Sequence, residues 1–132
     1  MSPPFRFTSL CALAALCGAC SSPRRTAEKT LERVGPDRVR QEAAVFYKDM
    51  FAAASASFYN LKLNECPATF RMFNPQHVVA YRDGFSLALD HGPSGESGLY
   101  IVPAQMDVSP NPGRRARFDR ITDGIYWYYF EP

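Results

Sequence analysis

The chain has few of the residues from which metal sites and nucleophilic catalytic centres are built. Only 2 of its 132 residues are histidines, His77 and His91, and they do not have the close spacing of paired zinc ligands. The sequence also lacks a Walker A phosphate-binding loop and a dinucleotide-binding glycine fingerprint. We therefore expect no metal ion and no cofactor.

Long apolar segments and a strong excess of one charge are also missing. The longest apolar run, Phe7 to Leu16, is shorter than the roughly 20 apolar residues needed to span a bilayer. The formal net charge is +2, and such a balance argues against a dedicated nucleic-acid-binding protein. We therefore expect no nucleic-acid partner.

The N-terminal segment has instead the order of features that is typical of an export signal. A basic residue, Arg6, precedes the short apolar run, and the run ends in small residues between Cys17 and Cys20. This pattern predicts that the segment directs the chain out of the cytoplasm.

The end of this segment resembles the lipobox of bacterial lipoproteins. Gly18, Ala19 and Cys20 match the lipobox. The lipobox usually has a leucine at the position that Cys17 occupies here, and Leu16 stands one place earlier. The resemblance implies cleavage before Cys20 and attachment of diacylglycerol to its thiol. With Ser21 following, it also implies sorting to the outer membrane, with the domain facing the periplasm.

Two other outcomes of processing remain open at this stage. Ordinary signal peptidase cleavage after Ala19 would give a soluble secreted or periplasmic protein, in which Cys20 and Cys66 could form a disulfide. Retention of the segment would leave an N-terminal anchor. The lipoprotein interpretation divides the chain into a signal peptide over 1–19, a lipidated tether over 20–26 and one α+β domain over 27–132.

The first half of the domain has helical periodicity. The sequence predicts a short helix over Ala27–Val34 that Gly35 terminates. It then predicts one long helix over Pro36–Asn60, in which apolar residues such as Phe46 and Met50 recur at intervals of three and four.

The second half of the chain has the pattern of antiparallel strands. Two Asp-Gly turns, Asp83-Gly84 and Asp123-Gly124, each separate a pair of predicted strands. The predicted strands are 77–82, 85–90, 99–102, 117–121 and 125–130. We therefore expect an α+β fold with one long N-terminal helix packed on an antiparallel sheet of about five strands, a layout similar to that of cystatin.

One pair of residues offers a candidate catalytic group. If Asp83-Gly84 forms a two-residue turn, His77 lies directly opposite Asp90, and a carboxylate there would orient the imidazole as a general base. An exposed cross-strand ion pair explains the same spacing without catalysis. No Ser or Cys is placed beside His77 or His91 by the sequence pattern.

The C-terminal strand and the segment before it supply the candidate binding residues. Alternation places Tyr126, Tyr128 and Phe130 on one face, which either binds a partner or is covered by the loop Ala104–Ala116. Basic residues precede this strand and could contact phosphate groups or merely line a solvated edge. They are Arg114, Arg115, Arg117 and Arg120.

The mature domain loosely resembles small uncharacterised bacterial envelope proteins, in its Gly35-Pro36 helix start and its closing stretch from Gly124 to Tyr128. That resemblance implies no activity. The expected function is a binding or structural role in the bacterial envelope, with the membrane as one partner through lipid on Cys20 and an envelope protein or polymer as the other. The alternative is a small secreted or periplasmic hydrolase that uses a His/Asp pair.

Overall fold

The computed structural model describes residues 22–52, 56–110 and 115–132. Two helices, α2 (Pro23–Val34) and α3 (Pro36–Phe51), precede a six-stranded antiparallel sheet. A 3-10 turn, η1 (Leu63–Glu65), and a short helix, α4 (Ala68–Arg71), lie between the first two strands. The strands are β1 (Phe58–Leu61), β2 (His77–Tyr81), β3 (Gly84–Gly92), β4 (Gly95–Ile101), β5 (Ala116–Thr122) and β6 (Ile125–Phe130). Their order in the sheet is β1-β2-β3-β4-β6-β5, so β1 and β5 form the edges.

The prediction of one long N-terminal helix on about five strands is wrong. The break between the two helices falls at Gly35, as predicted, where a φ of +97° is accessible mainly to glycine. The second helix, α3, ends at Phe51 rather than at Asn60. Residues 58–60, the predicted end of that helix, belong instead to strand β1, which pairs with β2. Aromatic residues favour a pleated, half-buried surface, and here that preference outweighs the helical spacing.

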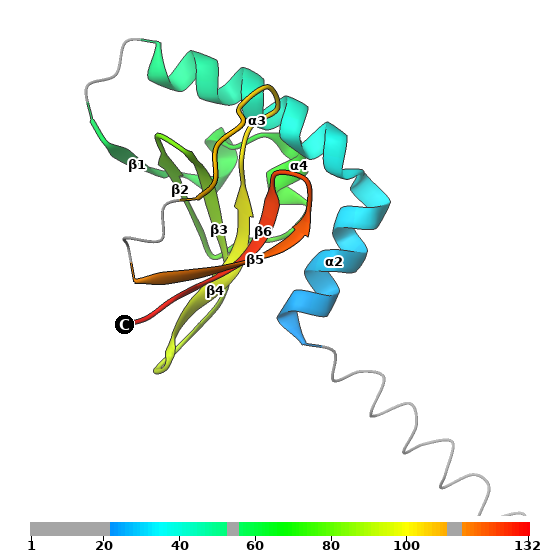
Figure 1. The fold of residues 1–132 in the computed structure, drawn as a ribbon, viewed down its shortest axis with the longest axis vertical. Helices are drawn as coiled ribbons and strands as arrows, with labels where there is room; N and C mark the ends of the chain where they lie inside the picture. Colours follow the sequence, from blue (N-terminus) through cyan, green and yellow to red (C-terminus); the bar gives the residue numbers. More distant parts are fainter. Residues whose placement is uncertain (1–21, 53–55, 111–114) are drawn as a thin grey trace, which may run out of the picture.

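The helices and the strands enclose the main core on one face of the sheet (Figure 1). Ala27 and Leu31 of α2 and Val39 of α3 are buried there against strand residues such as Phe85 and Leu99. Phe46 and Met50 are half-buried and pack on this cluster, and the Phe46 ring stacks on Phe85 at a centroid distance of 5.7 Å. The apolar residues that recur at intervals of three and four along α3 therefore face the sheet, as their spacing indicates.

A second, smaller core covers the opposite face of the sheet. Tyr100 and Tyr128 are fully buried there, together with Val102 from the segment that follows β4. Half-buried residues packed against this second core include Met106, Phe118 and Phe130. The face away from the two helices is thus closed by the chain's own residues.

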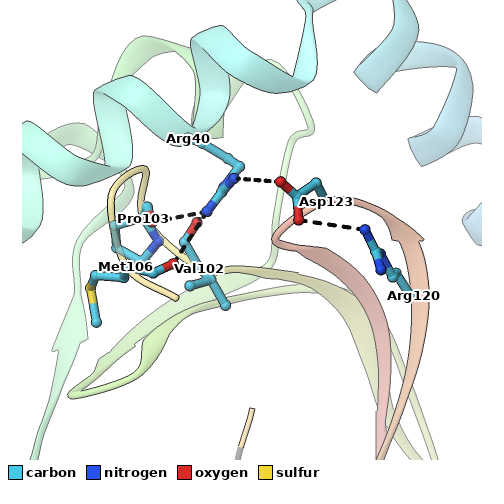
Figure 2. Close-up of polar contacts among 6 residues, drawn as sticks. All are labelled: Arg40, Val102, Pro103, Met106, Arg120 and Asp123. Atoms are coloured by element: carbon cyan, nitrogen blue, oxygen red, sulfur yellow. Dashed lines mark hydrogen bonds and ion pairs between the residues drawn. The ribbon is translucent and has the colours of Figure 1, made fainter. Parts of the chain in front are cut away.

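Arg40 connects α3 to the segment that closes the second core (Figure 2). Its guanidinium donates to the backbone oxygen of Val102 at 2.9 Å and to that of Pro103 at 3.2 Å. It also lies 3.6 Å from a carboxylate oxygen of Asp123, in the turn between β5 and β6. One side chain on the helix therefore holds two loops in place.

Candidate functional site

The structure places the three predicted aromatic binding residues on β6, an internal strand between β4 and β5. Tyr128 has no exposed surface, whereas Tyr126 and Phe130 are half-buried in the second core. The sequence left open whether this face binds a partner or is covered by the chain. In the structure, residues of the second core cover it. Tyr128 is therefore a core residue.

The three arginine residues near β5 that the structure describes have different surroundings. Arg117 lies over the ring of Tyr129 at 5.0 Å, on the face opposite to Tyr128, and Arg120 contacts Asp123 at 3.4 Å. Arg115 is exposed, with a φ of +55°. Arg114 and the lipidation candidate Cys20 lie outside the described residues.

The predicted pairing of His77 with Asp90 is wrong. Tyr81 pairs with Gly84, so the turn is Arg82-Asp83 and His77 lies opposite Ala88. Asp90 lies two residues further along β3, beyond the last β2 pair, and is opposite Ser97 of β4. The expected register depended on Gly84 being in the turn. Gly84 is instead in the strand, where a Cβ atom would lie 2.5 Å from the backbone oxygen of Ile101.

His77 has a different carboxylate partner, Glu96. Nε2 of His77 lies 2.6 Å from one oxygen of Glu96, and the hydroxyl of Tyr128 donates to the other oxygen at 2.7 Å. The Glu96 side chain is 13% exposed. Its two contacts join three strands, because His77 is on β2, Glu96 on β4 and Tyr128 on β6. Burial and the adjacent Glu96 raise the pKa of Tyr128, so the phenol remains a proton donor to the carboxylate.

This His-Glu-Tyr contact joins side chains from three strands. Among the residues that the structure describes, no hydrogen bond joins His77 or His91 to a Ser, Thr or Cys side chain. The same part of the chain contains no group of three His, Cys, Asp or Glu side chains placed to hold a metal ion.

A groove beside α3 is a candidate binding site because its lining combines apolar side chains with carboxylates. It has a volume of about 410 Å³, within the range of about 300–1,000 Å³ that is usual for ligand pockets. We call it the α3 groove; its lining residues are Gln41, Glu42, Val45, Phe46, Asp49, Glu65, Cys66 and Pro67. Sequence reasoning missed it because residues 65–67 come next to α3 only through the fold. The one available signal was Val45, an apolar residue off the buried stripe.

Cys66 forms part of the inner wall of the α3 groove. It is 5% exposed, and its Sγ atom lies 3.4 Å from the backbone oxygen of Lys62. Burial, with a smaller contribution from the Glu65 carboxylate, raises the pKa of the Cys66 thiol to about 11. The reactive thiolate is therefore rare near neutral pH.

We expect Cys66 in the folded protein to react with iodoacetamide at pH 8 about 100-fold more slowly than in the unfolded protein, because its pKa lies about two units above the ordinary value. Mass spectrometry of the Cys66 peptide, sampled over time with and without denaturant, measures the two rates. Equal rates would show that the thiol is accessible and ordinary.

No helix in the described part of the chain is long and apolar enough to cross a membrane. No protein-family model, curated protein or solved structure matches this chain.

Proposed function

We propose that this chain is a lipid-anchored protein of the bacterial envelope, attached to the membrane through Cys20, and that its folded domain has a binding role. The observation that carries the proposal is the lipobox-like stretch from Leu16 to Ser21, placed directly before the folded domain. In a diderm host, Ser21 favours the outer membrane, with the domain facing the periplasm.

The start of α2 supports a position close to the membrane. Pro23 begins the helix, so only Ser21 and Ser22 separate it from Cys20. At about 3.3–3.6 Å per extended residue, three steps of the chain reach about 10 Å. The expected tether over 20–26 is therefore shorter, because Pro23–Thr26 form the first turn of α2.

The charge of that first turn is consistent with the same position. It contains Arg24 and Arg25 and no acidic residue, although the positive end of the helix dipole favours acids there. Arg24 is compensated by Glu28 at 2.9 Å and by Asp119 at 3.3 Å, whereas Arg25 is exposed. Phosphates of lipid headgroups next to Cys20 would offset this unfavourable charge.

A binding role accounts for the geometry better than hydrolysis does. The imidazole of His77 contacts Glu96, which is itself held by Tyr128, and this arrangement offers a stable contact between strands. The α3 groove, in contrast, is an open apolar surface with charged residues around it.

We expect mass spectrometry of the mature N-terminus to find an acylated Cys20. A Cys20→Ala variant should lose the lipid and no longer fractionate with membranes, because the described domain has no helix that could span them. Cys66→Ala is the matched control, since it also removes one thiol, and it should remain in the membrane fraction. An unmodified Cys20, or a Cys20→Ala protein that stays with membranes, would contradict the proposal.

A further inference from the structure

The α3 groove combines a fixed apolar floor with an apolar residue on its rim. Phe46 forms part of the floor and is held from below by its stacking on Phe85 at 5.7 Å. Val45, one residue earlier, is 66% exposed, more than the other exposed large apolar side chains of the described residues. A partner that covers Val45 and Phe46 would bury apolar surface without rearranging the core.

The charged residues that line the groove have one sign, although Arg71 acts on Cys66 from outside the lining. The lining includes the carboxylates of Glu42, Asp49 and Glu65, and no lysine or arginine. Arg38 contacts Glu42 at 3.2 Å from outside the lining. Asp49 and Glu65 are exposed and form no ion pair within the described residues. Two carboxylates are thus left available to a partner.

We propose that the α3 groove binds a short segment of another protein in which an apolar side chain is flanked by lysine or arginine residues. The apolar side chain would occupy the space above Phe46, next to Val45. The flanking cations would contact the carboxylates of Asp49 and Glu65, which accounts for both features of the groove. The groove extends over two turns of α3, from Gln41 to Asp49, or about 12 Å at 1.5 Å per residue.

The same charges argue against the other classes of partner in an envelope. Anionic lipid headgroups and anionic polymers would be repelled by Asp49 and Glu65. A purely apolar segment would leave both carboxylates uncompensated. Of an envelope protein and an envelope polymer, the groove therefore fits the protein.

The position of the groove is compatible with membrane attachment. α3 leads away from the end of the domain at which α2 begins (Figure 1). In a domain anchored just before α2, the groove would remain accessible to a partner. Binding in the α3 groove rests on the proposed envelope role, but it does not require the lipid on Cys20.

The test uses the full-length processed protein in a zwitterionic detergent and three labelled 12-residue peptides. The first peptide has two leucines four positions apart with lysines on both sides; the second has glutamates in place of the lysines; the third has serines in place of the leucines. We expect fluorescence anisotropy to show that the first binds at least about tenfold more tightly than either of the others. Empty micelles give the background, and equal affinities for the three peptides would overturn the proposal.

A charge reversal in the groove tests the role of the carboxylates. Asp49→Lys combined with Glu65→Lys should lower the affinity for the lysine peptide about tenfold or more and raise the affinity for the glutamate peptide. Glu32→Lys combined with Asp107→Lys changes the net charge equally at exposed positions outside the groove, and it should leave both affinities unchanged. If the control pair shifts both affinities as much as the groove pair, the attraction is general and the assignment of the groove is wrong.

A neutral substitution tests the apolar part and remains informative if the charge-reversed protein does not fold. Val45→Ser should lower the affinity for the lysine peptide about fivefold. Val108→Ser, at another exposed valine, should leave that affinity unchanged. Sedimentation of the protein alone identifies a competing occupant. A dimer that Val45→Ser dissociates would assign the groove to a second copy of this chain and overturn the proposal. Because binding is measured whether or not Cys20 is acylated, failure here is distinct from failure of the anchor.

Discussion

Replacing Tyr128 by alanine is expected to destabilise the domain by about 3–5 kcal/mol, a cost in the range found for removing large aromatic side chains from a core. The Tyr128 ring has no exposed surface and lies with its centroid 4.5 Å from that of Phe130. Its removal leaves a cavity in the second core and takes away the hydroxyl that donates to Glu96. Chemical denaturation monitored by circular dichroism measures the loss.

Two further variants separate packing from hydrogen bonding. Tyr128→Phe keeps the ring and should cost about 1–3 kcal/mol, because the Glu96 carboxylate, 13% exposed, loses its donor. Tyr126→Ala removes a half-buried tyrosine from the same strand face and should cost less than Tyr128→Ala. If Tyr128→Ala unfolded at the denaturant concentration of the unchanged protein, the second core would not contribute to stability.

The pH dependence of stability provides an independent readout of Tyr128. Its pKa is raised in the folded state by burial and by Glu96, above the ordinary value of 10.0. The phenol therefore stabilises the fold fully below pH 10. Above that pH the unfolded chain ionises and the folded chain does not, so stability falls as pH rises. The alkaline decline should be less steep in Tyr128→Phe.

The sequence located most strands but could not specify their pairing. Asp123-Gly124 is the turn between β5 and β6, as its pattern predicts, since Thr122 pairs with Ile125. The same dipeptide at Asp83-Gly84 was misleading because Gly84 is required for the close approach of β4 rather than for the turn. Local sequence does not distinguish these two uses of glycine, because the second depends on a strand that is distant along the chain.

The candidate sites differ in how far local sequence could reach them. The N-terminal pattern that ends at Cys20 is linear, so it could be recognised without a fold. The partner of His77 depends on strand register and on strand order, because His77 lies opposite Ala88 rather than Asp90 and contacts Glu96 of β4 across β3. The α3 groove depends on a contact between segments about 20 residues apart, which no periodicity encodes. Long-range contacts therefore account for the part of the site that the sequence did not predict.

Replacing Arg40 by methionine should cost about 3 kcal/mol, because a charged donor to several partly buried acceptors is lost while an unbranched stem of similar shape is kept. The guanidinium is 15% exposed and donates to the backbone oxygens of Val102 and Pro103. A third acceptor, the oxygen of Met106, lies at 3.5 Å (Figure 2). Arg40→Lys keeps the charge without the planar fork, so its cost should lie between those of Arg40→Met and no change.

The loss should be concentrated in the segment that closes the second core. The amide of Ala104 donates to the backbone oxygen of Arg40 at 3.0 Å, and the Val102 amide donates to that of Gly124 at 2.8 Å. Hydrogen exchange at these two amides should therefore accelerate in Arg40→Met more than exchange within β3. Asp123→Asn is the matched control: this carboxylate is 84% exposed, and its loss should cost less than about 1 kcal/mol. Unchanged exchange at Ala104 in Arg40→Met would show that the segment is held by its apolar contacts alone. Faster exchange confined to the segment that closes the second core would show that Arg40, on the helix side of the sheet, keeps the opposite face closed.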